Sequence, residues 1–389
     1  MTLLTALLLA PLILLTMCFA IELFVGLAPL RRTTPLGPGP NATAVVIVPA
    51  HDEAPIIAAG LEKLKAAADQ SARILVVADN CTDRTAEIAR SLGVEVVERT
   101  DAARRGKGFA LDFARAHLRQ VPPDVVIIVD ADCTTDADSV ASLIARCIET
   151  GRPCQAVNLQ IPDRHGSPTV QLSTFAFFIK NVIRQRALQR LAGRVHLLGT
   201  GMAVPWQIFD RAALATDNIV EDLQMGVELA QEGHSPLFVE DASVWSHPET
   251  EKNTLAQRHR WEGGFLASAG RAVPAMLMRS LAAGDPKQLW AAINLSIPPL
   301  ALLVAIDLGG LILGSAAAFL TSADAWPVFA LAGSLFAATI GLTLAWALGG
   351  RRFVTLGGLA RVPFYLLWKL PMYAGFVRKG APTDWIRTR

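Results

Sequence analysis

The sequence predicts an α/β domain, built on a parallel sheet with helices on both faces, between membrane-spanning helices at the two ends of the chain. Two observations predict this class. Short β-branched runs alternate with amphipathic stretches between residues 44 and 129, which is the pattern of strand–helix repeats in parallel sheets. Long apolar segments with almost no charge lie near both ends, and each can cross a hydrocarbon core of roughly 30 Å.

Composition limits the possible function classes. The chain has 389 residues, of which 52% are hydrophobic and 18% charged, and its formal net charge is +2. It is too apolar for an ordinary cytosolic enzyme and too charged for a transporter made only of membrane helices. The near-neutral charge gives no support for nucleic-acid binding. The five cysteines form no CxxC pair and no Cys/His spacing, so we expect reduced thiols rather than disulfides or a zinc site.

Residues 1–30 are expected to form an N-terminal transmembrane helix. Glu22 is the only charge between Leu3 and Leu30, and Arg31-Arg32 comes directly after. A signal peptide would carry its charge before a shorter apolar run. The positive-inside rule therefore places the chain after this helix in the cytoplasm. Residues 31–43 read as a Pro/Gly-rich linker, and the catalytic domain is expected over residues 44–285.

The C-terminal residues 286–389 are expected to form a second membrane region. Leu289–Leu320 and Trp326–Leu348 each read as a spanning helix, and Pro298-Pro299 kinks or starts the first of them. The last apolar run, Phe353–Val377, has basic residues at both ends. That favours an interfacial or re-entrant helix, and a third C-terminal crossing is the alternative.

The first part of the soluble domain is expected to contain four strands, at Ala44–Pro49, Arg73–Ala78, Val94–Glu98 and Val125–Val129. Three helices are expected with them: Pro55–Ala68, a helix capped by Thr82 or Asp83 that runs to Ser91, and Lys107–Leu118. Runs such as AVVIVP and VVIIV are typical of strands that are buried on both faces. Ligands of parallel sheets bind at the carboxyl ends of the strands. Acidic residues follow three of these ends, namely Asp52 after Pro49, then Asp79, then Asp130 and Asp132.

The Asp130-Ala131-Asp132 motif predicts a metal site. In extended chain its two carboxylates point to the same side. Two hard oxygen ligands beside a diphosphate suit Mg²⁺ or Mn²⁺, which bridge phosphate oxygens. The alternative is a pair of aspartates that caps a turn.

Three further positions suit a nucleotide. Asp79 and the Asp52-Glu53 pair can accept hydrogen bonds from a nucleobase N–H and from ribose hydroxyls. Helix capping by Asp79, and first-turn charges favoured by the helix dipole for Asp52 and Glu53, are the alternatives. Lys107 lies in a glycine-containing basic loop that opens a helix. Such a loop suits a diphosphate, or it is a solvated basic turn.

Two later motifs suit the transfer chemistry. One carboxylate of Glu221-Asp222 can act as general base on an acceptor hydroxyl, unless the pair only caps a helix. In Gln257-x-x-Arg260-Trp261, arginine can hold diphosphate oxygens and tryptophan can stack on a sugar. An ordinary interfacial helix is the alternative. Val170–Leu191 is expected to be another surface-lying helix, whose aromatic and basic residues meet lipid.

Taken in order, these motifs resemble the membrane-embedded branch of the family 2 inverting glycosyltransferases, which includes cellulose, chitin and hyaluronan synthases and ceramide glucosyltransferase. The matching segments are VVIVPAHDEA (Val45–Ala54), VVADNCTDRT (Val76–Thr85), GKGFALDFA (Gly106–Ala114), VDADC (Val129–Cys133), GTGMAVP (Gly199–Pro205), VEDLQMG (Val220–Gly226) and QRHRW (Gln257–Trp261).

The resemblance implies a GT-A fold with a mixed, Rossmann-like sheet, a nucleotide-sugar donor that is most often UDP-linked, and Mg²⁺ or Mn²⁺. Together with the positive-inside rule, we expect an integral protein of a bacterial inner membrane with its catalytic domain in the cytoplasm. By position, Pro49, Asp52, Glu53, Asp79, Lys107, Asp130 and Asp132 look like donor-binding residues, with Asp132 and Asp130 at the metal. Glu221-Asp222 look like the catalytic pair, with Asp222 as the base. Gly199, Thr200, Gly201, Gln257, Arg260 and Trp261 look like the diphosphate and acceptor contacts.

Several alternatives stay open at the level of the sequence. The membrane portion is short for a synthase that exports its own polymer, so the acceptor is either a polysaccharide or a lipid. Nucleotidyl transfer can share the nucleotide-binding half, but it gives no reason for Glu221-Asp222 or for the QRHRW segment. A non-catalytic nucleotide-binding membrane protein would bind nucleotide without turnover.

Overall fold

The structure is a computed structural model that describes residues 2–31 and 42–380. Most of the predicted linker, residues 32–41, lies outside the described residues. The rest forms two compact units. The sheet unit comprises the described residues of Pro29–Ile161 and Gly193–Pro248, and the helical unit those of Met1–Ala28, Pro162–Ala192 and Glu249–Pro382. The predicted domain boundaries at 30, 43 and 285 stay predictions.

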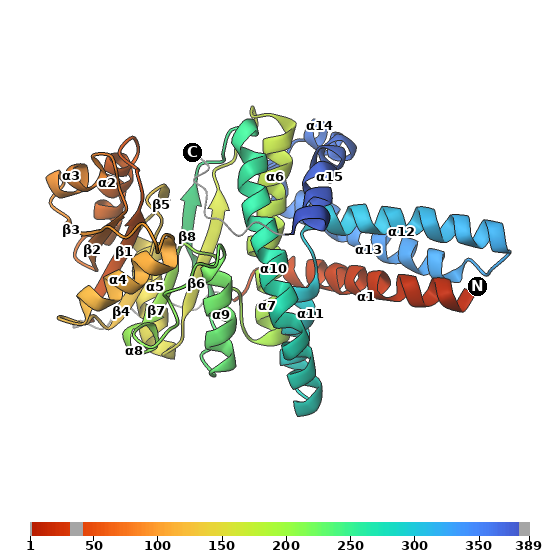
Figure 1. Ribbon diagram of the computed structural model, residues 1–389, viewed down its shortest axis with the longest axis horizontal. Helices are drawn as coiled ribbons and strands as arrows, with labels where there is room; N and C mark the ends of the chain where they lie inside the picture. The colour runs from red at the N-terminus through yellow and green to blue at the C-terminus, as the bar shows by residue number, and fades with distance from the viewer. Residues whose placement is uncertain (1, 32–41, 381–389) are drawn as a thin grey trace. The chain divides into compact units, whose positions relative to one another are not determined.

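The sheet unit is built on a mixed sheet (Figure 1). Its strands are β1 (Ala44–Ala50), β2 (Arg73–Asp79), β3 (Glu95–Arg99), β4 (Val125–Ile128), β5 (Cys133–Thr135), β6 (Cys154–Gln160), β7 (Met202–Pro205) and β8 (Leu237–Ser246). In the described part of the chain their order is β3-β2-β1-β4-β7-β6-β8-β5. The helices of this unit are α2 (Ile57–Ala68), α3 (Thr85–Ser91), α4 (Lys107–Leu118), α5 (Ala137–Thr150), α8 (Trp206–Phe209) and α9 (Glu221–Gln231).

The first half of the sheet is parallel, as the strand–helix repeat predicts. β1 pairs in parallel with β2 and β4, and β2 pairs in parallel with β3. Asp79 and Arg99, which end β2 and β3, are direct partners in this register. The second half departs from the parallel pattern, because β7 runs antiparallel to both β4 and β6. Because β1, β2, β3 and β4 all run parallel to one another, their carboxyl ends share one edge of the sheet.

Alternation along the strands sorts the core into two layers. Val46 and Val48 of β1 pack in one cluster with Leu61 of α2 and Leu143 of α5. The intervening Val45 and Ile47 pack in the other cluster, with residues of α4, α8 and α9. Side chains of a strand alternate between its two faces, so α2 and α5 cover one face and α4, α8 and α9 the other.

The helical unit contains α1 (Thr2–Gly26), α6 (Pro168–Phe178), the π-helical turn η1 (Ile179–Ile183), α7 (Arg184–Ala192), α10 (Glu251–Ala283), α11 (Pro286–Ser296), α12 (Leu300–Thr321), α13 (Trp326–Leu348), the 3₁₀ turn η2 (Gly350–Arg352), α14 (Leu356–Leu359) and α15 (Val362–Lys379). Among the residues described, three helices are long and apolar enough to cross a membrane, namely α1, α12 and α13. Whether the run at Phe353–Val377 crosses or lies at the interface stays open.

The three long apolar helices lie side by side (Figure 1). Small residues allow this close approach: a β-carbon at Gly341 of α13 would lie 2.8 Å from the Cβ of Leu23 on α1. Helices in lipid associate through such small-residue contacts and through polar pairs. Asp307 of α12 supplies a polar pair, since it is fully buried and accepts a 2.8 Å hydrogen bond from Thr16 of α1.

A buried polar cluster joins three helices of this unit. Glu22 of α1 is fully buried, and its carboxylate accepts from the Nε of Arg184 on α7 at 2.7 Å and from the Nδ2 of Asn294 on α11 at 2.6 Å. Arg184 also donates to the carbonyl of Asn294 at 3.0 Å. Each charge in the cluster thus has its partner within hydrogen-bond distance, as buried charges require.

Two sequence-based expectations for this unit can be compared with the structure. Pro298-Pro299 starts the spanning helix rather than kinking it, since α12 begins at Leu300 and residues 289–296 belong to the separate helix α11. Val170–Leu191 does not expose its aromatic face. Phe175, Phe177 and Phe178 are buried, and Phe178 stacks on Phe353 with ring centroids 5.1 Å apart. Glycines 349 and 350 make room for these rings, since β-carbons there would touch Phe178 and Phe175.

Candidate active site

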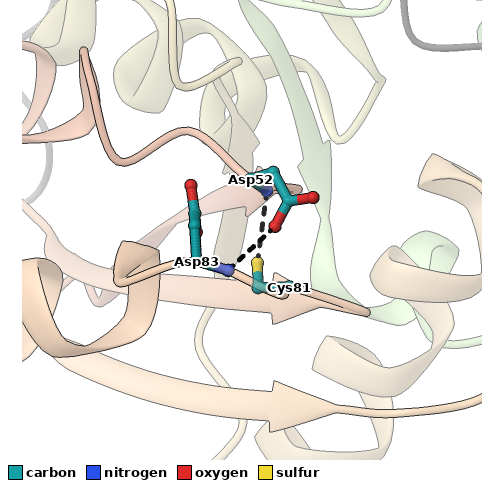
Figure 2. Close-up of side chains that lie close together, drawn as sticks. All are labelled: Asp52, Cys81 and Asp83. Carbon is teal, nitrogen blue, oxygen red and sulfur yellow. Dashed lines mark hydrogen bonds between the residues drawn. The ribbon is translucent and has the colours of Figure 1, made fainter.

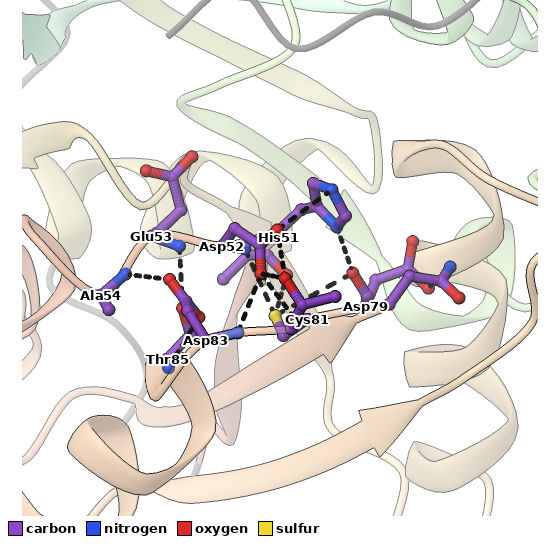
Figure 3. Close-up of polar contacts among 11 residues, drawn as sticks. His51, Asp52, Glu53, Ala54, Asp79, Cys81, Asp83 and Thr85 are labelled. Atoms are coloured by element: carbon purple, nitrogen blue, oxygen red, sulfur yellow. Dashed lines mark hydrogen bonds and ion pairs between the residues drawn. The ribbon is translucent and has the colours of Figure 1, made fainter.

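The loops after β1 and β2 are held together by side chains that accept from backbone N–H groups (Figure 3). The Oδ1 of Asp52 accepts from the backbone N–H groups of Thr82 at 2.6 Å and Asp83 at 3.2 Å. The Thr85 hydroxyl oxygen in turn accepts from the N–H of Glu53 at 2.8 Å. Asp52 has a φ of 53°, in the left-handed region. These bonds fix the shape of the edge. Burial is the largest single effect on Asp52 and raises its pKa, but the hydrogen bonds from Thr82 and Asp83 and the charge of His51 together outweigh it and lower the pKa.

Asp52, Cys81 and Asp83 lie close enough to suggest a metal site (Figure 2), but their donor chemistry argues otherwise. Asp83 accepts from the N–H groups of Ala54 and Thr85, and Asp52 is engaged as described above. Burial, followed by the charges of Asp52 and Asp83, raises the pKa of the Cys81 thiol, whereas a metal needs the thiolate. These residues therefore hold the loops after β1 and β2 together rather than bind a metal.

Asp79 is paired with an arginine that none of the sequence motifs includes. Arg99 Nη1 donates to Asp79 Oδ1 at 2.6 Å, and both side chains are 9% exposed. Arg99 also donates to the carbonyl of Arg104 at 2.7 Å and to Asp101 at 3.2 Å. Its position in the sequence could have indicated it, because Arg99 is the last residue of β3 just as Asp79 is the last residue of β2.

A second group of predicted site residues lies around Lys107. It is the first residue of α4, and its ammonium donates to Asp130 Oδ1 and, at 2.7 Å, to the carbonyl of Gly199. Burial opposes its charge, but the neighbouring carboxylates of Asp130, Glu221 and Asp222 outweigh that effect and raise its pKa. The structure therefore brings one cation and three acids into one place, in the sheet unit.

Glu221 and Asp222 are the first two residues of α9. The N-cap residue is Val220, before them, and it makes no side-chain capping bond. Glu221 and Asp222 are therefore not the N-cap pair that the alternative reading required. Asp222 faces the glycine loop, because a β-carbon at Gly199 would lie 3.3 Å from its Oδ2 and 3.6 Å from the Nζ of Lys107. Burial and the charge of Asp222 raise the pKa of Glu221 to about 8, so the pair retains a proton to a higher pH than an isolated carboxyl does.

The loop Gly199-Thr200-Gly201 is braced from the sheet. Gly199 has a φ of +83° and Gly201 of +66°, values at which a side chain is strained. The buried Gln155 donates to the carbonyl of Thr200 at 2.9 Å and accepts from the N–H of Leu198 at 2.8 Å. The Thr200 hydroxyl accepts from the N–H of Asp130 at 3.1 Å. This loop thus fixes both Asp130 and the carbonyl that Lys107 contacts.

Asp130 and Asp132 fit a hard divalent cation. Their oxygens and the sulfur of Cys133 all lie within 4.8 Å of one another. Burial, followed by the charge of Asp132, raises the pKa of the Cys133 thiol well above its usual value, so Cys133 is not a thiolate ligand. The remaining set is two carboxylates, which suits Mg²⁺ or Mn²⁺ rather than a softer metal.

Gln257, Arg260 and Trp261 lie on α10, in the helical unit. The ring of Trp261 packs against Phe177 of α6 with centroids 5.9 Å apart, and the guanidinium of Arg258 lies 5.2 Å from its centroid. Arg258 also donates to Ser173 Oγ at 2.7 Å. The structure therefore fixes the orientation of Trp261 through α6, and Gln257 is buried beside it.

The comparisons with known proteins bear on this arrangement. The family model described as "Glycosyltransferase like family 2" matches residues 40–264, more than half of the chain. The chain belongs to this family. The membership agrees with the resemblance carried by the motifs.

A solved structure and a curated protein are similar to this chain. The mannosyltransferase PcManGT from Pyrobaculum calidifontis, in complex with GDP-Man and Mn²⁺, aligns with 97% of this chain and 95% of its own, at a TM-score of 0.54 and 18% identity. At that identity the likeness shows the fold, and it confirms the predicted GT-A class. The low-salt glycan biosynthesis hexosyltransferase Agl6 of Haloferax volcanii is 38% identical over 104 residues, which are 26% of this chain and 24% of that protein. The chain thus matches only a small part of the length of that relative.

Proposed function

We propose that this glycosyltransferase family 2 protein is a membrane-bound inverting enzyme that transfers a sugar from a nucleotide-sugar, a UDP-sugar, to a hydroxyl of a polysaccharide or lipid-linked acceptor. The observation that carries the proposal is the charge balance around Gly199. One lysine meets the carboxylates of Asp130, Glu221 and Asp222 there. Acids that perturb one another's titration around a buried cation are characteristic of functional sites.

Asp222 is the proposed general base. Burial and the charge of Asp222 raise the pKa of Glu221 to about 8, which favours Asp222 as the base of the pair. Asp222 takes the proton of the acceptor hydroxyl, whose oxygen forms a bond to the anomeric carbon. The bond from that carbon to the diphosphate oxygen breaks, and its electron pair leaves with the nucleoside diphosphate. Attack from the opposite face inverts the centre, so an α-linked donor gives a β-linkage.

The leaving group needs positive charge. The ammonium of Lys107 is held at the glycine loop, where it offsets charge that develops on the diphosphate. Asp130 and Asp132 would hold Mg²⁺ or Mn²⁺, whose charge would help to neutralise the same group. The proposal assigns Pro49, Asp52, Glu53 and Asp79 to the nucleoside, the loop Gly199–Gly201 to the acceptor, and Gln257, Arg260 and Trp261 to the diphosphate and acceptor.

The proposed location is a bacterial inner membrane, with the sheet unit in the cytoplasm. Arg31 comes after α1, and Arg351 and Arg352 come after α13, and basic residues mark the cytoplasmic ends of spanning helices. A periplasmic reporter that is active when fused after Arg352 would contradict this orientation.

The test is donor turnover by purified protein in nanodiscs. UDP-glucose, UDP-N-acetylglucosamine, UDP-galactose and GDP-mannose are offered with Mg²⁺ or Mn²⁺, and release of nucleoside diphosphate is followed. Asp222→Asn is expected to lower kcat by about 10²- to 10⁴-fold, the usual contribution of a general base. Glu228→Gln, on the same helix, is the matched control and should keep its rate. Product size then separates a polysaccharide from a glycolipid. Equal turnover by Asp222→Asn, or no release from any donor with membrane lipids present, would contradict the proposal.

A further inference from the structure

We propose that Lys369 and Tyr373 of α15 are positioning residues, which hold the segment of α10 assigned to the diphosphate and acceptor in one orientation. The inference rests on the proposed function, in which Arg260 of that segment contacts the diphosphate. Both helices belong to the helical unit, where α10 packs against α6 and α15 (Figure 1). Lys369 and Tyr373 follow their partner on α10, Glu262, by 107 and 111 positions, so no local motif links them to it.

The contact between α10 and α15 is centred on Glu262, the residue directly after Trp261. Its Oε1 accepts from the ammonium of Lys369, and its Oε2 accepts from the hydroxyl of Tyr373 at 2.8 Å. The Lys369 side chain is 3% exposed and that of Glu262 is 13% exposed. Groups from one neighbouring helix thus occupy both oxygens of the carboxylate, and two directional bonds at one point oppose rotation of α10 about its axis.

Packing alone does not explain a lysine at position 369. It stands between Trp368 and Leu370 in the apolar sequence of α15, and a buried ion pair adds little stability over apolar side chains of similar volume. Its ammonium also lies 5.3 Å from the ring centroid of Tyr365 and 5.7 Å from that of Tyr373, contacts that favour a cation. A directional pair of this kind specifies one arrangement of two helices rather than a tighter one.

Two sides of α10 are held by its neighbours. Arg258 and Trp261, three residues apart, both contact the ring of Phe177 on α6. His259, one turn before the acid that binds α15, has its ring 4.9 Å from that of Phe376 on α15. Residues three apart share a side of a helix, so α6 holds one side of α10 and α15 holds the next.

The remaining side carries the groups that the proposed function needs. Gln257 and Arg260 are also three residues apart and stand on neither of the two held sides. With two sides fixed, the direction in which this third side points is fixed as well. Loss of the bonds to Glu262 would leave α10 attached to α6 while releasing its orientation, and a small misplacement of a contacting group weakens binding.

The test compares a ligand that has a diphosphate with one that lacks it. Full-length protein in detergent is titrated by calorimetry with UDP and uridine, and with GDP and guanosine in parallel, in the presence of Mn²⁺. The measured quantity is the ratio of diphosphate to nucleoside affinity. The orientation of Arg260 changes this ratio, because the nucleosides have no diphosphate, whereas a general loss of stability lowers the melting temperature instead.

Lys369→Met should lower the ratio by about tenfold, the effect of one lost hydrogen bond to a charged group. Tyr373→Phe removes only a hydroxyl and should lower it by about two- to tenfold. The chain has two tyrosines, so Tyr365→Phe is the matched control. Within the described residues the Tyr365 hydroxyl gives no hydrogen bond to Glu262, and its loss should leave the ratio unchanged.

A double variant tests whether Lys369 acts through Arg260. Arg260→Gln alone should lower the ratio, and Lys369→Met/Arg260→Gln should lower it no further, because both changes remove the same contact. If Lys369→Met does not fold, as its melting temperature will show, Glu262→Leu/Lys369→Leu takes its place. That variant removes both buried charges, which is often neutral for stability, and its ratio should also fall.

The outcomes separate the two proposals. An unchanged ratio in the folded Lys369 and Tyr373 variants, with a lowered ratio in Arg260→Gln, would overturn the positioning role and leave the proposed function in place. Additive falls in the double variant would also overturn it, because Lys369 would then not act through Arg260. An unchanged ratio in Arg260→Gln, or no binding of UDP or GDP, would overturn the proposed function on which the inference rests.

Discussion

Two charged clusters of this protein are built on opposite plans. In the helical unit, Glu22 is fully buried, and Arg184 and Asn294 meet both of its oxygens. In the sheet unit, Lys107 lies among Asp130, Glu221 and Asp222, and the acids outnumber the cation. The first cluster is complete within the chain. The second groups three acids around one lysine, at the edge where the donor is proposed to bind.

In a third cluster the acid is again paired within the chain. Glu262 of α10 accepts from the ammonium of Lys369 and, at 2.8 Å, from the hydroxyl of Tyr373, both on α15. Paired charges thus recur where helices of the helical unit meet, whereas the acid-rich cluster around Lys107 lies at the carboxyl edge of the sheet. The difference suggests a rule for this molecule: clusters of one acid with its partners hold helices together, and the acid-rich cluster around Lys107 is the one proposed to serve chemistry.

Breaking the balanced cluster should have the largest effect on stability. Glu22→Ala leaves the Arg184 guanidinium buried without its counter-charge, and removal of one partner of a buried ion pair costs about 3–5 kcal/mol. Thermal unfolding in detergent should show a large fall in melting temperature. The double variant Glu22→Leu/Arg184→Leu removes both charges and should recover much of that loss. A single variant as stable as the wild type would show that the pair does not hold these helices.

Removing Lys107 from the acid-rich cluster should affect catalysis more than folding. Lys107→Met takes away the charge that faces the departing diphosphate, and loss of one such group typically lowers kcat by about 10²- to 10³-fold. Lys107→Arg, which keeps the charge, should retain more activity. Donor turnover and melting temperature measured side by side check this. A Lys107→Met protein with normal kcat would remove Lys107 from the mechanism.

The proton held by Glu221 gives a pH dependence of stability. Its pKa is raised from 4.5 to about 8 by burial and by Asp222, so the folded state binds the proton more tightly than the unfolded state. Stability from this group is therefore full below pH 4.5 and is lost as the pH rises through about 8. Melting curves in EDTA should show this slope in the wild type and a flatter profile in Glu221→Gln. The same slope in both proteins would contradict it.

An exposed pair should matter least. Arg90 and Glu98 are about half exposed, at 52% and 54%, and such surface pairs contribute about 0–1 kcal/mol. Arg90→Gln should therefore change the melting temperature little, and high salt should not enlarge the difference. A loss as large as that of Glu22→Ala would erase the contrast between buried and surface charge.

The sequence predicted the parallel half of the sheet and the acids along its edge, because β1, β2 and β4 are largely apolar runs that an aspartate ends or closely follows. It did not predict β5 to β8. Several of these strands are short or mix polar with apolar residues, as in Gln155 and Asn158 of β6, and β8 pairs with a register shift between Ala156 and Val157. Tertiary pairing rather than local preference forms them.

The site was only partly readable from the sequence for a similar reason. Lys107, Asp130 and Asp222 stand in local motifs, and the structure places them around one glycine loop. Arg99 stands in no motif, and its pairing with Asp79 exists only through the register of β2 and β3. The aromatic residues of α6 were misjudged because their partners, Gly349, Gly350 and Phe353, lie far along the chain.

The cysteines of this chain offer a built-in reporter. Cys18, Cys133, Cys147 and Cys154 are buried, and Cys81 alone of the five is half-buried. It lies in the loop after β2, beside the residues assigned to the nucleoside. Because its raised pKa keeps the thiol protonated at neutral pH, alkylating reagents should modify it selectively at alkaline pH. A bound nucleotide would shield that sulfur, so the rate of labelling would report occupancy of the site in the unaltered protein.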